Sequence, residues 1–303
     1  MLLEYWEHTG DIKILRRYYF DCRTILEAFR RCIDTNTGLL GATGFWDFVD
    51  WQSAWNENSG QPGALKKGPS TVMSLMLACA LEDTARIGEL AGFQAEAKEY
   101  RVQKETLLQA VRKYCFDGIR GMFREGPSYP EFYQGTQSWA VLAGAISGNE
   151  AVTALRNSVE SEDVLKCTFS TSFEFFRACE KTGCYELTER QLQLFIDLTE
   201  EHCTTVPETP VHSRSECHGW SALPIYELFH CYAGMHQVPG EPGKYTVMPW
   251  LGRLDNLFGS FPTSRGLIHF SASREKGKVS ISLEVPEGIK VIEEGTGEKK
   301  KMT

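Results

Sequence analysis

Residues 70 to 115 read STVMSLMLACALEDTARIGELAGFQAEAKEYRVQKETLLQAVRKYC, and this stretch decides the fold class. Ser70 is a residue type that commonly caps the start of a helix, so we predict a helix from there to about Ala91. Gly92 favours a sharp helix end, and a second helix then runs to about Cys115. Two long helices joined by so short a link form an antiparallel hairpin.

Further helices are predicted on both sides of this hairpin. From Asp11 to Ile33, apolar residues recur three and four positions apart, as on one face of an amphipathic helix. Residues 3–8 read as the end of an earlier helix before a turn at Gly10. The later helices are expected at about 134–147, 150–160, 171–182, 188–202 and 219–233, with Gly234 as the last C-cap. The chain is therefore expected to be mainly α.

Long and short connections alternate along these helices. The long ones are expected at 35–69, 116–133, 161–170 and 203–220. Because each antiparallel hairpin returns the chain to its starting end, every long connection should lie at the same end of the helices. The aspartates and tryptophans of 45–51 and the polar residues of 203–220 are therefore predicted to share one rim.

The periodicity of the sequence changes after Gly240. Short alternating or β-branched runs, separated by glycine and proline, are typical of antiparallel strands. These runs occur at 245–248, 267–271, 279–283 and 290–292. We therefore expect two domains, a helical one in residues 1–238 and a small β domain in residues 239–303.

Composition narrows the class of partner. The chain has 303 residues, 42% of them hydrophobic, with a formal net charge of −8 and no basic stripe, which argues against binding nucleic acid. No apolar run approaches the length of a membrane span, and the N-terminal residues lack the features of a signal peptide, which favours a cytoplasmic protein without a membrane partner. Ten cysteines are scattered without paired spacing, as free thiols in a reducing compartment would be.

The connection from Cys203 to Trp220 holds the densest group of reactive side chains. They are Glu208, His212, Arg214, Glu216 and His218. A zinc site is the alternative reading of this region. Its possible ligands are His202, Cys203, His212, Cys217, His218, His230 and Cys231, but their spacing matches no compact zinc motif. We predict neither a metal nor another cofactor.

Four motifs in order carry a family resemblance. They are FWDFVDW (45–51), TTVPE (204–208), SRSECHGWSA (213–222) and FPTSRG (261–266). Together they resemble the α-L-rhamnosidases of glycoside hydrolase family 78, which are six-hairpin glycosidases. The resemblance implies a partial (α/α)6 barrel followed by a small antiparallel β module, and hydrolysis of a terminal α-L-rhamnoside with inversion.

By this resemblance Glu208 matches the family's general base, which activates a water molecule. An inverting glycosidase also needs a carboxylic acid on the opposite face of the sugar, about 6.5–9.5 Å away. In the family that acid lies upstream of the first helices, and no matching segment precedes Asp11. The sequence is therefore expected to be an N-terminally truncated barrel that lacks its first helices, and an incomplete β domain is expected after it.

The remaining site candidates each have a structural alternative. Asp47 and Asp50 are expected to bind sugar hydroxyls or to cap turns, and Trp46 and Trp51 to stack on a sugar or to belong to the core. His218 matches a family histidine near the sugar, or begins a helix.

Three further residues are candidates for substrate binding. Arg214 either contacts substrate or pairs with Glu216. Tyr133 and Trp139 belong to the next rim connection and helix, where packing competes with substrate contact.

Two other functions stay open at this point. One is a non-catalytic carbohydrate-binding module or a broken fragment whose missing N-terminal segment, or a second copy, completes it. The other is an (α/α)6 enzyme acting on uronic-acid-containing glycans, which would need basic residues such as Arg214 to meet a carboxylate.

Overall fold

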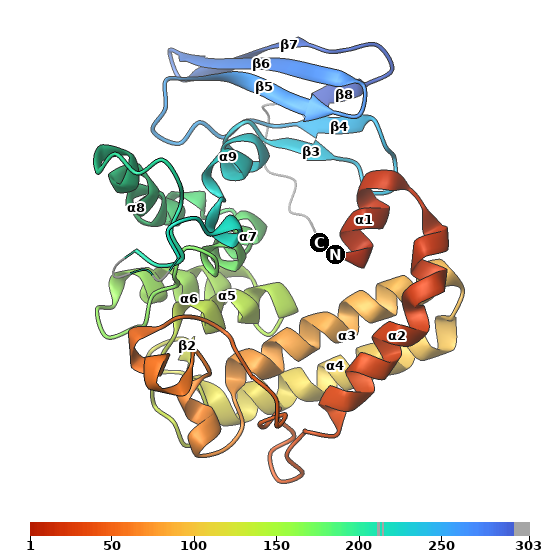
Figure 1. The fold of residues 1–303 in the computed structure, drawn as a ribbon, viewed down its shortest axis with the longest axis vertical. Coiled ribbons are helices and arrows are strands. Elements are labelled where there is room, and N and C mark those ends of the chain that lie inside the picture. The colour runs from red at the N-terminus through yellow and green to blue at the C-terminus, as the bar shows by residue number, and fades with distance from the viewer. Residues whose placement is uncertain (211–212, 214, 294–303) are drawn as a thin grey trace. The chain divides into compact units, whose positions relative to one another are not determined.

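The protein is described by a computed structural model that covers residues 1–210, 213 and 215–293 (Figure 1). Two compact units divide the chain. The helical unit comprises residues 16–223, and the β unit comprises residues 1–15 together with those from 224 onward. Among the described residues, no helix has the length and apolar character needed to cross a membrane.

The predicted helices up to residue 202 are confirmed, with small differences in their ends. They are α2 (Ile12–Arg30), α3 (Thr71–Ala91), α4 (Gln94–Cys115), α5 (Gln134–Ala143), α6 (Gly148–Glu160), α7 (Ser172–Thr182) and α8 (Glu189–Glu200). A two-stranded hairpin of β1 (Phe116–Asp117) and β2 (Met122–Phe123) follows α4. Helix α5 packs against α3, α6 and α7, which places it at the centre of the helical unit.

The hairpin of α3 and α4 has the caps that its sequence predicts. The Ser70 hydroxyl accepts a hydrogen bond from the backbone N–H of Met73, which satisfies one of the free donors in the first turn. Gly92 ends α3 with a φ of 100°, a conformation that is strained for residues with a side chain. Helices α3 and α4 therefore run antiparallel, side by side (Figure 1).

Hydrogen bonds tie three of the four long connections together at one rim. Gln52, from the first connection, donates to the backbone oxygen of Lys166 in the third. Trp55, also from the first, donates its indole N–H to Glu131 of the second at 2.7 Å. The predicted common rim is confirmed for these three connections. The fourth, predicted at 203–220, runs from residue 201 to 223 between α8 and Pro224, and its position at the same rim stays a prediction.

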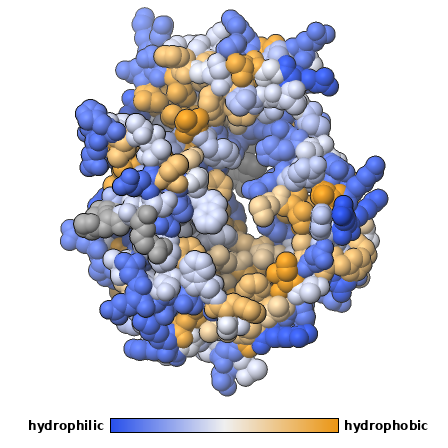
Figure 2. Space-filling model, in the orientation of Figure 1, coloured by the Kyte–Doolittle hydropathy of each residue, from blue (hydrophilic) through white to orange (hydrophobic). Residues whose placement is uncertain are grey.

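The helical unit has a continuous apolar core. Leu75, Phe123 and Leu155 are fully buried in it, and burying such a side chain contributes about 1.5–3 kcal/mol. Other apolar side chains remain at the surface, among them Phe20 and Ile25 of α2. Figure 2 accordingly shows hydrophobic residues among hydrophilic ones on the visible face.

The single helix predicted for residues 219–233 is wrong. The segment contains a 3₁₀ turn, η4 (Gly219–Ser221), a one-turn helix, α9 (Pro224–Glu227), and a π-helical turn, η5 (Leu228–Tyr232). Proline has no N–H and disfavours the helical conformation in the residue before it, so Pro224 separates η4 from α9. Gly234 adopts a φ of 62° after the last turn, in keeping with its predicted place at the end of the segment.

The described part of the β unit contains two three-stranded sheets. The first has the order β3 (Met235–Gln237), β4 (Lys244–Val247) and β8 (Lys290–Glu293), and the second has the order β5 (Asn256–Thr263), β6 (Gly266–Glu275) and β7 (Lys278–Glu284). All pairs are antiparallel except β4 with β8, which is parallel. The small, mainly antiparallel module is confirmed, and the parallel pair corrects the expectation for the last strand.

The compact units differ from the predicted domains in two segments. Helix α1 (Leu2–Thr9), which ends at Gly10 as predicted, belongs to the β unit. The backbone N–H of Gly240 donates to the oxygen of Glu7 at 2.8 Å, and the Gln237 amide donates to the same oxygen at 3.0 Å. Residues 224–238 also belong to this unit. The family domain boundary after residue 238 stays a prediction.

Candidate active site

Asp50 lies at the centre of a buried polar network at the rim. Its side chain has no exposed surface. The carboxylate accepts hydrogen bonds from Gln52 Nε2 at 2.7 Å, Tyr133 OH at 2.8 Å, Thr171 Oγ1 at 2.8 Å, Thr168 N at 3.1 Å and Thr168 Oγ1. Four of these donors reach Oδ2 and one reaches Oδ1, so most of the roughly four lone-pair sites of the carboxylate are occupied. Their number favours a role in holding the connections together, and the predicted contact with a sugar stays a prediction.

Tyr133 lies at the start of α5 and Trp139 lies within this helix, in different surroundings. Tyr133, the N-cap residue of α5, is 1% exposed, and its ring meets that of Trp55 edge-on with centroids 4.9 Å apart. Burial, and then the Asp50 charge, raise the pKa of Tyr133 well above its usual value, so its hydroxyl keeps the proton that it donates to Asp50. Trp139 is half-buried and packs against the helical core. These contacts describe the packing alternative for both residues, and substrate contact stays a prediction.

Trp46 and Trp51 belong to an aromatic group on the first connection. The Trp46 ring lies 5.1 Å from Phe48 and 6.3 Å from Trp51, measured between centroids. The Trp46 indole N–H donates to the backbone oxygen of Ser59 at 2.9 Å, which fixes the ring although 62% of the side chain is exposed. An exposed and anchored aromatic face suits stacking on the apolar face of a sugar ring.

Asp47 closes a local turn in the same connection. Its carboxylate accepts hydrogen bonds from the backbone N–H of Thr43 at 3.0 Å and from the Thr43 hydroxyl. The side chain is 8% exposed. These are the contacts expected of a turn cap, one of the two predicted alternatives for Asp47.

Glu208 and His218 come together within the 201–223 connection. The backbone N–H of Glu208 donates to Ser215 O at 2.9 Å and to Ser213 Oγ at 3.0 Å. His218 Nε2 lies 3.9 Å from Glu208 Oε1, which is beyond direct hydrogen-bonding distance. The edge of the His218 ring meets that of Trp220 at 5.5 Å between centroids. The Glu208 side chain is 11% exposed, and the two hydrogen bonds given above hold its backbone.

The predicted site residues thus form two groups within the helical unit. The first group belongs to the long connections that hydrogen bonds join at one rim, and it comprises Asp47, Asp50, Trp46, Trp51 and Tyr133. Glu208 and His218 form the second group, whose contacts given above all lie inside the 201–223 connection. Arg214 lies outside the described residues.

Two carboxyl groups that the sequence analysis missed have pKa values shifted by burial. Glu125 is fully buried and accepts hydrogen bonds from Ser70 Oγ and Val72 N, both at 3.2 Å, and from Thr136 Oγ1. Burial nevertheless raises the pKa of Glu125 to about 7. Burial also raises the pKa of Glu174, in the first turn of α7, to about 7.

A pattern in the sequence could have drawn attention to Glu174, whereas no pattern marks Glu125. Thr171 and Glu174 form the Thr-x-x-Glu pattern of a helix start. The burial of Glu125 depends on residues far away in the sequence.

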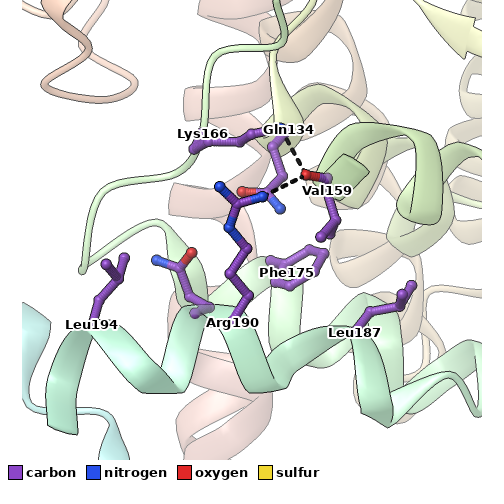
Figure 3. A pocket seen from close by; sticks show the side chains of 8 residues that line it. Gln134, Val159, Lys166, Phe175, Leu187, Arg190 and Leu194 are labelled. Carbon is purple, nitrogen blue, oxygen red and sulfur yellow. Dashed lines mark hydrogen bonds between the residues drawn. The ribbon is translucent and has the colours of Figure 1, made fainter. Parts of the chain in front are cut away.

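A separate pocket of about 180 Å³ opens between α5, α6, α7 and α8 (Figure 3). It is lined by Gln134, Val159, Lys166, Phe175, Leu187, Arg190, Gln191 and Leu194. Figure 3 shows Lys166 and Arg190 directed at the same backbone oxygen, that of Val159, at 3.1 and 3.3 Å. Both cations therefore hold the carbonyl end of α6. None of the predicted site residues lines this pocket.

The described residues of the helical unit contain no group suited to a metal ion. Within it, no three histidine, cysteine or carboxylate side chains bring ligand atoms within 4.8 Å of one another. Cys203 and Cys217, considered above as zinc ligands, are exposed thiols. His212 lies outside the described residues.

Two sequence comparisons give significant matches. Residues 1–160 match the model of the bacterial alpha-L-rhamnosidase 6 hairpin glycosidase domain, which is more than half of the chain. An alignment 154 positions long, which covers 46% of this chain, is 26% identical to the 3-O-beta-D-glucopyranosyl-beta-D-glucuronide phosphorylase of Paenibacillus borealis and covers 20% of that protein.

Solved structures of rhamnosidases share the fold. The rhamnosidase of Bacillus sp. GL1, a member of glycoside hydrolase family 78, matches 97% of this chain with a TM-score of 0.83 and 22% identity. The Streptomyces avermitilis α-L-rhamnosidase complexed with L-rhamnose matches 94% with a TM-score of 0.71 and 15% identity. The chain spans 32% and 28% of these two structures, respectively.

Proposed function

The chain belongs to the bacterial α-L-rhamnosidase six-hairpin glycosidase family, and from this premise we propose that the protein hydrolyses terminal α-L-rhamnosides with inversion at the anomeric carbon. The fold shared with the Streptomyces enzyme, which was solved with L-rhamnose, supports the substrate class. The chain spans less than a third of the Bacillus and Streptomyces structures, so the activity of those whole proteins is only proposed for this chain.

Glu208 carries the proposal as the general base. Its carboxylate is nearly enclosed, its backbone is held by Ser213 and Ser215, and His218 lies beside it. In an inverting reaction this carboxylate takes a proton from water while the water oxygen bonds to the anomeric carbon. A second carboxylic acid gives its proton to the departing glycosidic oxygen, and we expect it on a segment outside the four motifs.

The first test replaces Glu208 with glutamine and measures hydrolysis of an aryl α-L-rhamnoside. Loss of a positioned base should lower kcat by about 10² to 10⁴-fold, with a small change in the free energy of unfolding. Glu216→Gln is the matched control, because Glu216 is an exposed carboxylate on the same connection. Activity above one tenth of wild type in Glu208→Gln contradicts the assignment.

The stereochemistry of the product is a separate test. Proton NMR of the first rhamnose released by the wild-type protein should show the β anomer, because water attacks the face opposite the α-linked leaving group. Release of the α anomer would contradict inversion, and no turnover of any aryl rhamnoside would contradict the hydrolase proposal for this chain.

A second candidate is phosphorolysis of a glucuronide-containing glycan. The observation that favours it is the similarity to the Paenibacillus phosphorylase named above, which covers nearly half of this chain. In that reaction phosphate replaces water as the nucleophile. Turnover of a glucosyl-glucuronide that depends on added phosphate, together with no turnover of rhamnoside, would support this candidate over the first.

A third outcome would favour carbohydrate binding without catalysis. L-rhamnose that binds a wild-type protein lacking any turnover indicates a binding module. A cytoplasmic location, and association with a second copy or with an N-terminal segment, stay predictions from the sequence.

A further inference from the structure

Two buried glutamine side chains line the pocket between α5, α6, α7 and α8. Gln134, the first residue of α5 (Figure 3), is 3% exposed, and Gln191 of α8 is 7% exposed. The backbone N–H of Cys167 donates to Gln134 Oε1 at 3.0 Å. Gln191 Nε2 donates to the Ser172 hydroxyl at 2.6 Å, and this hydroxyl gives its own proton to Thr168 O at 2.7 Å. Each amide is therefore held by one of its two ends.

These contacts also fix which end of each amide is left for a ligand. A backbone N–H can only donate, so the atom of Gln134 that faces Cys167 is the oxygen, and the nitrogen is the other end. The Ser172 hydroxyl has already used its proton, so Gln191 meets it with nitrogen and keeps its oxygen. Within the described part of the chain, Gln134 Nε2 and Gln191 Oε1 have no hydrogen-bond partner. Such groups in buried side chains are unfavourable unless something binds them.

Two cations at this pocket have no carboxylate partner. Lys166 Nζ uses its three protons on backbone oxygens at the end of α6, those of Ser158, Val159 and Ser161. Arg190 donates one N–H to the same Val159 oxygen at 3.3 Å. Neither cation forms an ion pair with any residue that the structure describes, and the other donors of Arg190 have no acceptor there. Burial, and then the charge of Arg190, lower the pKa of Lys166. The pocket therefore carries positive charge that an anion would balance.

The size and lining of the pocket narrow the class of ligand. Its volume of about 180 Å³ is below the roughly 300–1,000 Å³ of pockets for drug-sized ligands, so it suits a single small molecule. A guanidinium edge matches one carboxylate through two parallel hydrogen bonds. Gln134 Nε2 needs an acceptor and Gln191 Oε1 needs a donor, and a hydroxyl group supplies both. Phe175 and Leu187 give the pocket an apolar side for a carbon skeleton.

We propose that this pocket binds a sugar acid of monosaccharide size, with its carboxylate on Arg190 and its hydroxyls on Gln134 and Gln191. Lys166 contributes charge without a hydrogen bond of its own, because its protons are already used. The site lies outside the predicted catalytic residues, none of which lines the pocket. It goes beyond the proposed hydrolysis of rhamnosides and does not depend on it.

Isothermal titration of the whole chain at pH 7 with D-glucuronate, D-glucose and inorganic phosphate tests the proposal. Glucuronate should bind at least about tenfold more tightly than glucose, which lacks only the carboxylate, because a hydrogen bond to a charged group is stronger than one to a neutral group. Arg190→Gln should weaken glucuronate binding about tenfold or more. Gln134→Glu keeps the oxygen for Cys167 but replaces the free donors with a negative charge, so it should weaken binding at least as much.

Arg156→Gln is the matched control, because Arg156 is an exposed arginine of α6 that does not line the pocket. It should bind glucuronate as the wild type does. Melting temperatures of all variants separate a loss of binding from a loss of folding. Wild-type affinity in Arg190→Gln, equal affinity for glucose and glucuronate, or no binding of glucuronate overturns the inference. Phosphate that binds as tightly as glucuronate overturns the sugar acid as the ligand.

NMR of the side-chain amides locates the bound molecule. The Gln134 amide signal, identified by its absence in Gln134→Glu, should shift as glucuronate is added, with the midpoint that the titration gives. Glucose at the same concentration should leave it in place. A Gln134 signal that stays unshifted while glucuronate saturates the protein would put the ligand elsewhere, and the inference would be wrong.

Discussion

Asp50 and Glu208 are held in place in two different ways. Asp50 has no exposed surface and accepts hydrogen bonds from several donors, two of which lie 83 and 121 positions away in the sequence. Glu208 is fixed through its backbone by Ser213 and Ser215, which lie on the same connection. The Asp50 carboxylate is engaged by tertiary hydrogen bonds, whereas the hydrogen bonds given for Glu208 hold its backbone N–H. The first three long connections are thus held to one another by tertiary hydrogen bonds, and our proposal assigns the reaction to the connection that contains Glu208.

The largest effect on stability is expected from Asp50→Ala. The substitution leaves the buried donors of Tyr133 and Thr168 without their acceptor, and each such group is unfavourable by about 1–3 kcal/mol. We expect the free energy of unfolding to fall by at least about 3 kcal/mol, measured by urea denaturation. Asp47→Ala, which removes only a local turn contact, is the control. If the two variants lose similar amounts, the contrast between tertiary and local hydrogen bonds is wrong.

Glu125 tests the stability of the helical unit through pH. Its pKa rises from 4.5 to about 7 on folding, so the folded state binds the proton more tightly than the unfolded state. The resulting stabilisation is complete below pH 4.5 and is lost as the pH rises through 7, an effect of about 3 kcal/mol.

Urea denaturation of wild type and Glu125→Gln at pH 5 and pH 8 measures this effect. The wild type should lose more stability than the variant between these values. Glu174 changes the stability of both proteins in the same direction. The loss in the free energy of unfolding between pH 5 and pH 8 is therefore compared between wild type and variant. Equal losses in both would show that Glu125 is ionised in the folded protein.

Tyr133→Phe removes a single donor from Asp50. The other donors to this carboxylate remain, so we expect a loss of about 1 kcal/mol in the free energy of unfolding. Calorimetry should show a lower melting temperature with an unchanged fold. A loss as large as that of Asp50→Ala would mean that the hydrogen bonds of Thr168, Thr171 and Gln52 to Asp50 depend on the Tyr133 hydroxyl.

The smallest effect on stability is expected from Ser213→Ala. Its hydroxyl accepts the backbone N–H of Glu208 within a local loop, so global stability should change by less than about 1 kcal/mol. If Glu208 is the base, kcat for an aryl rhamnoside should nevertheless fall, because the carboxylate is held less firmly. An unchanged kcat would show that Ser213 does not position the base.

Much of the fold is predictable because its signals are local. The helices between Ile12 and Glu200 follow from apolar periodicity and from caps such as Ser70 and Gly92. Strand β5 was missed because it contains Gly259 and Pro262, which sequence patterns count against a strand. Pro262 is tolerated because β5 lies at the edge of its sheet. The helix predicted across Pro224 failed because its apolar spacing outweighed the proline.

The candidate site was predicted less completely than the fold. Motifs identified Glu208 and Asp50, but not that Asp50 would accept hydrogen bonds from two other connections. Glu174 was missed because its altered pKa arises from burial and from the charge of Asp50. Such effects depend on neighbours in space, which sequence spacing does not describe.

The sequence by itself determined the hairpins, and from their connection lengths it predicted the rim. Periodicity, caps and loop lengths act over a few residues and need no knowledge of distant contacts. Only the tertiary structure decided the surroundings of Asp50. Its hydrogen bonds and desolvation depend on chain segments more than a hundred positions apart, as Asp50 and Thr171 are.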